Sequence, residues 1–287
     1  MGESLTERIP GRLRAISSRQ NPLVKLLREA FAQGRAVDGM CAVEGVRLIE
    51  EAIRSSLKVH ALFVRESAQT KSERILDQLS KHAEALLLPE TVFDSAVVTE
   101  HPQGIAALVK VREQTLESAL AAMPAMVVVA AGIQDPGNFG TLIRSAEAFG
   151  VTAVVGIEGT VNQWSPKTAR ASAGSIFRLP VVKAATDDLM GRLRAQSVAT
   201  IALTTPHADG TFGDGSNPRS PRRLQDSDLT RQCALFVGNE GAGLARELLS
   251  KIEEFVAIPQ SRVESLNAGV AASIALYEAQ RQRSAMR

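Results

Sequence analysis

From residue 125 onward, short apolar runs alternate along the chain with stretches of helical periodicity. The runs are continuously apolar and rich in β-branched residues, which is typical of strands covered on both faces. The expected strands are 126–133, 152–157, 198–203, 234–237 and 255–258. The helices expected between and after them are 139–149, 187–196, 244–251 and 266–282. Such alternation predicts an α/β domain with a mostly parallel sheet, helices on both faces and right-handed crossovers.

The first 112 residues have a different pattern. Pro22 can begin a helix, because its missing N–H is not needed there, and apolar residues at helical spacing follow it. A second helical pattern lies at 46–53, and strand-like runs lie at 40–43, 61–64 and 105–111. We therefore expect a small α/β domain at 1–112, a linker with a little helix at 113–124, and a second domain at 125–287.

Three polar segments follow expected strands of the second domain, at 134–140 (QDPGNFG), 238–244 (GNEGAGL) and 258–267 (IPQSRVESLN). Ligands of open α/β sheets bind beyond the carboxyl ends of the strands, so these segments predict one site. The middle segment resembles a nucleotide-binding turn, although residues 239–240 can also be simple turn residues. Arg246 stands where a dinucleotide fingerprint needs glycine, and no GK[ST] follows, which argues against a dehydrogenase or a kinase.

The helices beside these segments also have purely structural interpretations. Asp135 or Asn138 can cap the helix that follows the first segment, and Ser265 can cap the last helix. Arg144, expected in the second turn of its helix, can equally be a surface arginine on an amphipathic helix. The small residues after 267 form a smooth face that allows close packing against a helix or a second subunit. Spacing alone leaves these alternatives open.

Composition and charge restrict the protein class only mildly. The 287 residues are 45% hydrophobic and 22% charged, as in soluble globular proteins, and a net charge of +2 permits a nucleic-acid partner without requiring one. No apolar run reaches the roughly 18 residues of a membrane span, and the N-terminus has no apolar signal segment, so we expect a cytoplasmic protein without membrane association. Cys41 and Cys233 have no metal-ligand spacing, which indicates buried thiols and no metal site.

One segment of the second domain loses the alternating pattern. Residues 206–223 are rich in Gly, Pro, Ser and Arg, which predicts a solvent-exposed loop. Its arginines either contact phosphates or are simply solvated; they are Arg219, Arg222 and Arg223.

Taken together, the three polar segments resemble the ordered signature motifs of the SpoU/TrmH family of RNA 2′-O-ribose methyltransferases, within the SPOUT superfamily. The resemblance covers about residues 124–284, and the stretch 165–181 resembles the family between its first two motifs. The matching residues are Asn138, Gly140, Arg144 and Ala146 in the first motif, 238–243 in the second, and Ser265, Leu266 and Asn267 before an Ala-rich helix in the third.

This resemblance implies the fold, the reaction and the partners. The expected fold carries a C-terminal trefoil knot, and the expected assembly is an obligate homodimer whose active sites take residues from both subunits. The methyl donor is S-adenosyl-L-methionine and the acceptor is an RNA 2′-hydroxyl, in ribosomal (23S) RNA by preference and in tRNA as the alternative. A non-catalytic RNA-binding protein of the same fold is the remaining alternative.

The resemblance also assigns residues to the reaction. Arg144 is expected to orient and stabilise the 2′-hydroxyl or the adjacent phosphate, because a guanidinium pKa above ~12 excludes a simple base. The other catalytic residues are expected to be Asn138, Glu240, Ser265 and Asn267. The cofactor-binding residues are expected to be Leu203, Thr204, Gly238, Asn239, Gly243, Ile258 and Leu266.

The N-terminal part resembles, more loosely, the substrate-binding domain that accompanies many of these enzymes, with a ribosomal-protein-like α/β fold. The matching stretches are 17–25, 43–45 and 101–105. The RNA-binding residues are expected to be Arg19, Asn21, Lys25, Lys167 and Arg170. One departure concerns residues 260–264, which are one residue shorter than the family pattern and lack its glycine. We expect a differently shaped loop behind the cofactor.

Overall fold

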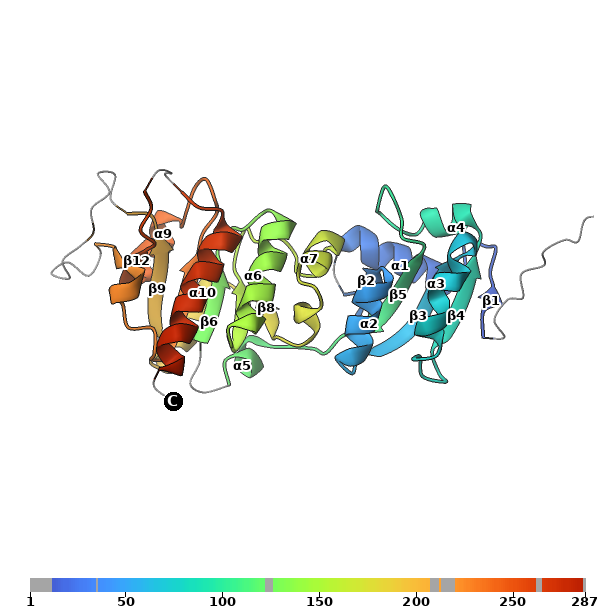
Figure 1. Cartoon of the computed structure of the whole chain (residues 1–287), viewed down its shortest axis with the longest axis horizontal. Helices are drawn as coiled ribbons and strands as arrows, with labels where there is room; N and C mark the ends of the chain where they lie inside the picture. Colours follow the sequence, from blue (N-terminus) through green and yellow to red (C-terminus); the bar gives the residue numbers. More distant parts are fainter. Residues whose placement is uncertain are drawn as a thin grey trace, which may run out of the picture. The chain divides into compact units, whose positions relative to one another are not determined.

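The computed structural model describes residues 12–34, 36–121, 126–206, 212, 220–261 and 265–285. The chain divides into two compact units, labelled by element in Figure 1. The first comprises Met1–Glu113 with Trp164–Pro166, and the second comprises Gln114–Gln163 with Lys167–Arg287. Each unit has its own sheet.

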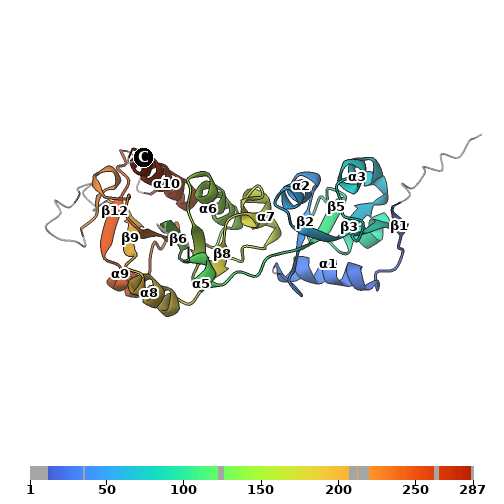
Figure 2. The same ribbon diagram turned by 90° about the horizontal axis from the view of Figure 1, so that it is seen from below.

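The first unit is a mixed sheet between helices. Its strand order is β1 (Arg14–Ala15), β4 (Glu84–Leu88), β3 (Lys58–Arg65), β5 (Ile105–Lys110) and β2 (Met40–Glu44). Strand β5 runs antiparallel to both of its neighbours, whereas β1, β4 and β3 are parallel. Helix α1 (Pro22–Gln33) lies on one face, and α2 (Val46–Arg54) and α3 (Gln69–Leu76) lie on the other (Figure 2). The short helices are Glu66–Ala68 and α4 (Glu90–Asp94).

Helix α1 begins at Pro22, as predicted. The side chain of Asn21 caps it by accepting hydrogen bonds from the N–H groups of Leu23 (2.9 Å) and Val24 (3.4 Å), and Gly34 ends it in the left-handed conformation. The buried face of α1 then packs on Phe63 and other sheet residues.

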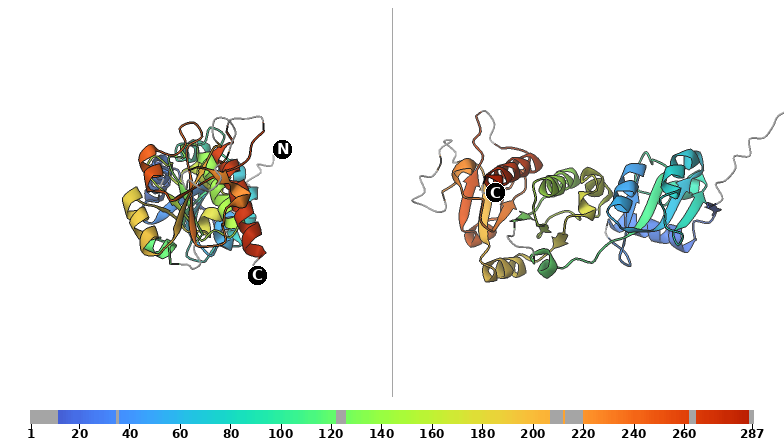
Figure 3. Two further views of the ribbon diagram at one scale, coloured as in Figure 1. Left: turned by 90° about the vertical axis from the view of Figure 1, so that its left-hand side faces the viewer. Right: turned by 60° about the horizontal axis from the view of Figure 1, so that its bottom comes forward.

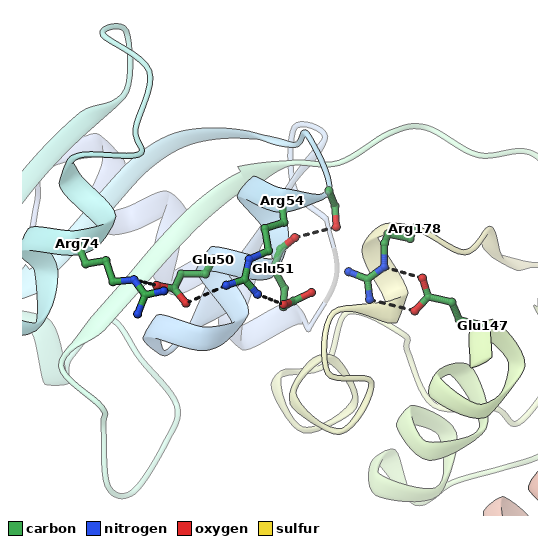
Figure 4. A network of polar contacts seen from close by, with 7 residues as sticks. Glu50, Glu51, Arg54, Arg74, Glu147 and Arg178 are labelled. Carbon is green, nitrogen blue, oxygen red and sulfur yellow. Dashed lines mark hydrogen bonds and ion pairs between the residues drawn. The ribbon is translucent and has the colours of Figure 1, made fainter.

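Helices α2 and α3 are joined through one carboxylate (Figure 4). Glu50 of α2 is nearly buried and pairs with Arg74 of α3 at 2.9 Å and with Arg54 at 3.8 Å. A buried charge needs such partners, so this pairing fixes the helices on the sheet.

The second unit is a wholly parallel sheet with helices on both faces, which confirms the predicted fold class. Its strand order is β10 (Arg222–Arg223), β12 (Glu254–Ala257), β9 (Ala199–Thr204), β11 (Cys233–Val237), β6 (Met126–Ala130), β7 (Ala153–Gly156) and β8 (Val181–Lys183). On one face lie α5 (Leu116–Ala119), α8 (Thr186–Ala195) and α9 (Arg246–Lys251); on the other lie α6 (Pro136–Ala148), α7 (Pro166–Ala171) and α10 (Ala268–Ser284) (Figure 2). Two short 3-10 helices are Ser175–Phe177 and Leu224–Asp226.

Helices α6 and α10 run side by side over the sheet (Figure 3, right). A Cβ at Gly269 would lie 3.3 Å from Asn138 O and from Thr141 Cβ, so the small residues of α10 allow close packing. Ser145 and Ser273 share a hydrogen bond of 2.7 Å between the same helices. The small-residue face of α10 therefore packs against a helix of the same chain, α6, which is the first of the two predicted alternatives.

Three predicted helix starts are wrong by two or three residues. Helix α6 begins at Pro136 rather than at 139, because Asp135 Oδ1 accepts the N–H of Asn138 (2.8 Å); Arg144 therefore lies in the third turn. Helix α10 begins at Ala268, and its cap is Asn267, whose Oδ1 accepts from Val270 N (3.2 Å), not Ser265. Helix α9 begins at Arg246 rather than at 244, because residues up to Leu244 belong to the turn after β11.

Two further predictions concern the sequence between 206 and 223 and the cysteines. Arg222 and Arg223 form β10 rather than loop, and the Arg223 guanidinium lies 5.2 Å from the centre of the Phe212 ring. Arg219 is outside the described residues.

Both cysteines are buried, and burial raises the pKa of Cys41 to about 12. In the described part of the chain, no helix is both long and apolar enough for a membrane span. The trefoil knot stays a prediction.

Candidate active site

The carboxyl ends of β9, β11 and β12 surround a cavity of about 790 Å³ at one edge of the parallel sheet. Its lining comes from residues 203–206, from the turn after β11, and from segments that follow β12 and begin α10. The volume is that of a site for a nucleoside-sized ligand. The cavity lies where the topology of an open α/β sheet predicts a ligand.

The turn after β11 is held rigid by its own backbone. Asn239 and Gly243 exchange two backbone hydrogen bonds (3.1 and 2.9 Å), and Asn239 Oδ1 accepts from Gly241 N (2.9 Å) and Ala242 N (3.1 Å). The Asn239 amide also donates to Gly132 O (3.1 Å), beyond β6. At Gly238 a Cβ would lie 2.5 Å from Gly243 C, so only glycine fits there. Asn239 is thus a turn residue that also ties β11 to β6.

Three of the predicted catalytic side chains form a continuous hydrogen-bonded chain. Asn138, at the start of α6, donates through Nδ2 to Glu240 Oε1. Asn267 donates through Nδ2 to Asn138 Oδ1 (2.9 Å). These hydrogen bonds join the first motif to the second and third motifs, which lie more than a hundred residues further along the sequence. They set the Glu240 carboxylate at the cavity wall.

Arg144 does not reach this cavity within one chain. It is exposed on α6, and among the described residues it makes no hydrogen bond or ion pair and does not line the cavity. The neighbouring residue Ser145 faces α10. The guanidinium is therefore available to groups outside the chain.

The predicted cofactor residues all lie in the lining of one cavity. They are Leu203, Thr204, Gly238, Asn239, Gly243, Ile258 and Leu266, joined there by Glu240 and Ser265. Among the lining residues that the sequence did not single out are Thr205, Pro206, Gln260, Ala268 and Ala271. Of these, Gln260 could have been predicted from the sequence, because it is a polar residue that follows Ile258 and Pro259 after a buried strand.

The comparisons with known proteins agree with this geometry. Residues 125–277 match the SpoU rRNA methylase family, and residues 13–107 match the MRM3-like substrate binding domain. The chain belongs to the SpoU rRNA methylase family. It is therefore an RNA 2′-O-methyltransferase that uses S-adenosylmethionine.

Individual relatives match almost from end to end. The chain is 32% identical to the 23S rRNA (guanosine(2553)-2′-O)-methyltransferase RlmP of Bacillus subtilis over 267 residues, which is 92% of this chain and 98% of that protein. A crystal structure of an RNA 2′-O ribose methyltransferase aligns with a TM-score of 0.73 and 30% identity, covering 94% of this chain and 100% of the other. An AdoMet-bound rRNA methyltransferase from Sinorhizobium meliloti aligns with a TM-score of 0.75 and 27% identity, covering 94% and 98%.

The cavity of this SpoU protein fits S-adenosylmethionine in chemistry as well as in size. Apolar side chains such as Leu203 and Leu244 can cover the faces of an adenine ring, and the glycine turn exposes backbone groups to it. Glu240 supplies a negative charge at the wall nearest Asn138, where a sulfonium would be favoured. Among the residues that the structure describes, the buried Oε1 of Gln260 in the cavity wall has no hydrogen-bond partner.

The predicted RNA-binding cations have different surroundings. Lys167 pairs with Asp135 at 3.0 Å. A backbone hydrogen bond from Asn138 and then this lysine lower the pKa of Asp135. Arg170 is on α7. In the first unit, Arg19 is exposed and donates to Thr91 O (3.1 Å), and Lys25 is exposed on α1.

A second cavity of about 770 Å³ lies on the other side of the turn after β11 and shares Asn239, Ala242 and Gly243 with the first. Its wall carries three carboxylates and one lysine, namely Glu158, Asp187, Glu247 and Lys251. Lys251 is already paired with Asp187 at 2.7 Å. This acidic wall disfavours phosphate, so RNA phosphates are not expected there.

Proposed function

We propose that this SpoU protein transfers a methyl group from S-adenosylmethionine to a ribose 2′-hydroxyl of 23S ribosomal RNA. The observation that carries the proposal is the chain of hydrogen bonds through Glu240, Asn138 and Asn267 beside the 790 Å³ cavity. It joins all three motifs at one place, which is what a methyl-transfer site requires: a donor pocket with oriented polar groups next to it.

Each side chain of the site has a defined task in this reaction. When bound, S-adenosylmethionine supplies an electrophilic methyl group on a positively charged sulfur. Glu240, oriented by Asn138, holds a negative charge at the cavity wall. Ser265 and Asn267 position the nucleotide or the methionine part. Arg144 orients the 2′-hydroxyl or the adjacent phosphate and stabilises the negative charge that develops on oxygen, while a phosphate or water takes the proton.

The exposed surface of α10 supports a homodimer. Val270, Ile274 and Tyr277 are 47%, 39% and 58% exposed and lie on one face of the helix, at i, i+4 and i+7. The Tyr277 ring also meets Phe149 edge-on at 6.0 Å. Apolar side chains gathered on one exposed face are typical of an interface. A second subunit packed on this face would complete the site, with the partner subunit's Arg144 facing the cavity.

The first unit is proposed to bind the RNA substrate. Arg19 and Lys25 present positive charge there, and Lys167 and Arg170 do so in the second unit. Asn21 caps α1, so its oxygen is already used and an RNA contact is left to its amide group. Ribosomal RNA is favoured over tRNA because the 23S rRNA enzyme RlmP matches along both units. A ribosomal substrate supports a cytoplasmic location for the enzyme.

The proposal is tested with Arg144→Ala. Methyl transfer to 23S rRNA should fall by about 100-fold or more, the usual scale for losing one preorganised charge donor at a reacting oxygen. Binding of S-adenosylhomocysteine, measured by calorimetry, should stay within twofold, because Arg144 does not line the cavity of its own chain and is assigned to the acceptor RNA rather than to the cofactor. The matched control is Arg192→Ala, which removes an exposed helical arginine of α8 that pairs with Asp188 at 3.0 Å.

Three outcomes decide between the alternatives. Transfer by Arg144→Ala at the wild-type rate would show that the catalytic assignment is wrong. Wild-type transfer to tRNA but not to 23S rRNA, mapped as 2′-O-methyl sites, would select the tRNA enzyme. Binding of RNA without any methyl transfer would select the non-catalytic protein.

A further inference from the structure

The second cavity, of about 770 Å³, lies directly beside the proposed site of methyl transfer. The turn after β11 separates it from the cofactor cavity, and three residues of that turn, among them Asn239, line both. The next residue, Glu240, is bonded to Asn138, and Gln134 of the second cavity lies shortly before Asn138 in the chain. A group bound in the second cavity would therefore be a close neighbour of the reacting atoms.

Part of the lining is suited to a flat aromatic group. Ile157 and Leu248 are buried and contribute apolar surface to the cavity. At Gly132 and Gly243, which also line it, no group of the described residues lies within 4 Å of the position that a Cβ would take. Open space over bare backbone lets a ring approach closely. The volume is within the usual range for pockets that bind small molecules.

The polar part of the lining selects for hydrogen-bond donors. Glu158, Asp187 and Glu247 carry carboxylates, which accept hydrogen bonds and repel phosphate. The lysine of this wall, Lys251, is paired with Asp187 at 2.7 Å and with Glu247 at 3.6 Å. The cavity therefore suits the base of a nucleotide whose phosphates stay outside.

Glu158 is the carboxylate that the fold holds in one orientation. It follows β7, and its two oxygens accept hydrogen bonds from the N–H (3.0 Å) and from the hydroxyl group of Thr186 at the start of α8. The hydroxyl first and then the N–H lower the pKa of Glu158, so the exposed side chain is ionised at neutral pH. Each carboxylate oxygen has two lone pairs, so both oxygens can accept a second hydrogen bond.

We propose that the second cavity binds the base of the acceptor nucleotide, and that Glu158 selects guanine by accepting hydrogen bonds from its N1–H and 2-amino groups. This inference rests on the proposed function, since it takes an RNA 2′-hydroxyl as the methyl acceptor. Proteins commonly read an unstacked RNA base by its Watson–Crick edge. Guanine is the RNA base with two adjacent donors on that edge, and two parallel donors match the two oxygens of one carboxylate.

The experiment uses the full chain and 23S rRNA, either free or in ribosomal particles, in the form that the wild type methylates. The modified nucleotide is mapped first, and the rRNA is then rebuilt by ligation with guanosine or inosine at that position. Inosine lacks only the 2-amino group, so it forms one of the two bonds to Glu158. The wild type should methylate the guanosine rRNA with a kcat/KM about tenfold higher or more. Glu158→Gln should bring the two values to within about twofold, because the amide offers one acceptor in place of two.

The chain offers a matched control in Asp188→Asn. Asp188 is an exposed carboxylate at the same end of α8, pairs with Arg192 at 3.0 Å, and is absent from the lining of both cavities. This variant should keep the wild-type preference for guanosine. Both variants should bind S-adenosylhomocysteine within about twofold of the wild type, since Glu158 does not line the cofactor cavity.

The outcomes separate this inference from the proposed function. No transfer by the wild type to 23S rRNA in either form would overturn both. A mapped target other than guanosine, or equal wild-type rates on guanosine and inosine, would overturn the assignment of the second cavity alone. Equal losses on the two rRNAs in Glu158→Gln would also overturn it, and would point to a basic protein as the partner of the acidic wall. Should Glu158→Gln fail to fold, Glu158→Asp withdraws the carboxylate by one methylene, and the same loss of preference is expected.

Discussion

The two units use their sheets in opposite ways. In the first unit β5 runs antiparallel between β3 and β2, so the carboxyl ends of the strands are divided between two edges. The buried carboxylate of Glu44 is paired within the unit, because it accepts from Thr99 Oγ1 and from the N–H of Gln103. In the second unit all strands are parallel, so their carboxyl ends share one edge, and that edge holds the cavity.

The difference appears most clearly in two asparagines that cap helices. Asn21 caps α1 through its oxygen, and among the described residues its amide group has no partner. Asn267 caps α10 in the same way and also donates to Asn138. Asn267 therefore stabilises the start of α10 through its side-chain oxygen and the catalytic side chains through its amide nitrogen. The second hydrogen bond, to a distant segment, is what distinguishes Asn267 from Asn21.

The largest effect on ligand affinity is expected from adding a side chain inside the turn after β11. Gly238→Ala places a Cβ within 2.5–2.7 Å of backbone atoms of Gly243 and Leu244, which cannot move away singly. Overpacking of this kind costs about 1–3 kcal/mol, or up to about 100-fold in the affinity for S-adenosylhomocysteine. At Gly241 a Cβ would meet only Asn239 Oδ1 at 3.7 Å, so Gly241→Ala is the control and should bind within threefold. Equal losses in both variants would contradict a rigid turn.

The turn also shows how far the sequence alone could lead. Residues 238–244 could be assigned to a ligand site because they are rich in glycine and directly follow a buried strand. Both features can be read from the local sequence pattern. The bond between Asn138 and Glu240 was beyond reach, since it joins atoms 102 residues apart in sequence. Strand β4 was missed because its residues, EALLL, favour helix by propensity and become a strand only by pairing with β3.

The position of Arg144 shows a second limit. The motif pointed to the residue, but the predicted helix began three residues too late, so it placed Arg144 in the second turn of α6 instead of the third. Helix ends are decided by single hydrogen bonds, which periodicity does not reveal. The same holds at α10, where the cap is Asn267 and not Ser265.

A smaller effect should separate the two capping asparagines. Asn21→Ala and Asn267→Ala should each lower the free energy of unfolding by about 1 kcal/mol, the usual cost of losing a cap. At saturating 23S rRNA, where a weaker RNA contact of Asn21 no longer limits the rate, only Asn267→Ala should also slow methyl transfer, by about tenfold, because Asn138 Oδ1 loses its donor and Glu240 is held less firmly. Urea unfolding and a methyl-transfer assay on each variant check this. Equal rates in the two variants would show that the network through Asn138 is structural only.

The smallest effect concerns Asp135, which caps α6 at the border of the site and pairs with Lys167. Its pKa in the folded chain is lowered from 3.8 by the N–H of Asn138 and then by Lys167, so ionised Asp135 stabilises the fold above pH 3.8. That contribution is lost as the pH falls through the lowered pKa. Asn caps a helix about as well as Asp, so Asp135→Asn should cost only roughly 0.5 kcal/mol at pH 7 after solvent screening. In urea unfolding the gap between wild type and variant should shrink below pH 3.8. A gap that widens there would mean that the protonated carboxyl, rather than the carboxylate, is the form that caps α6.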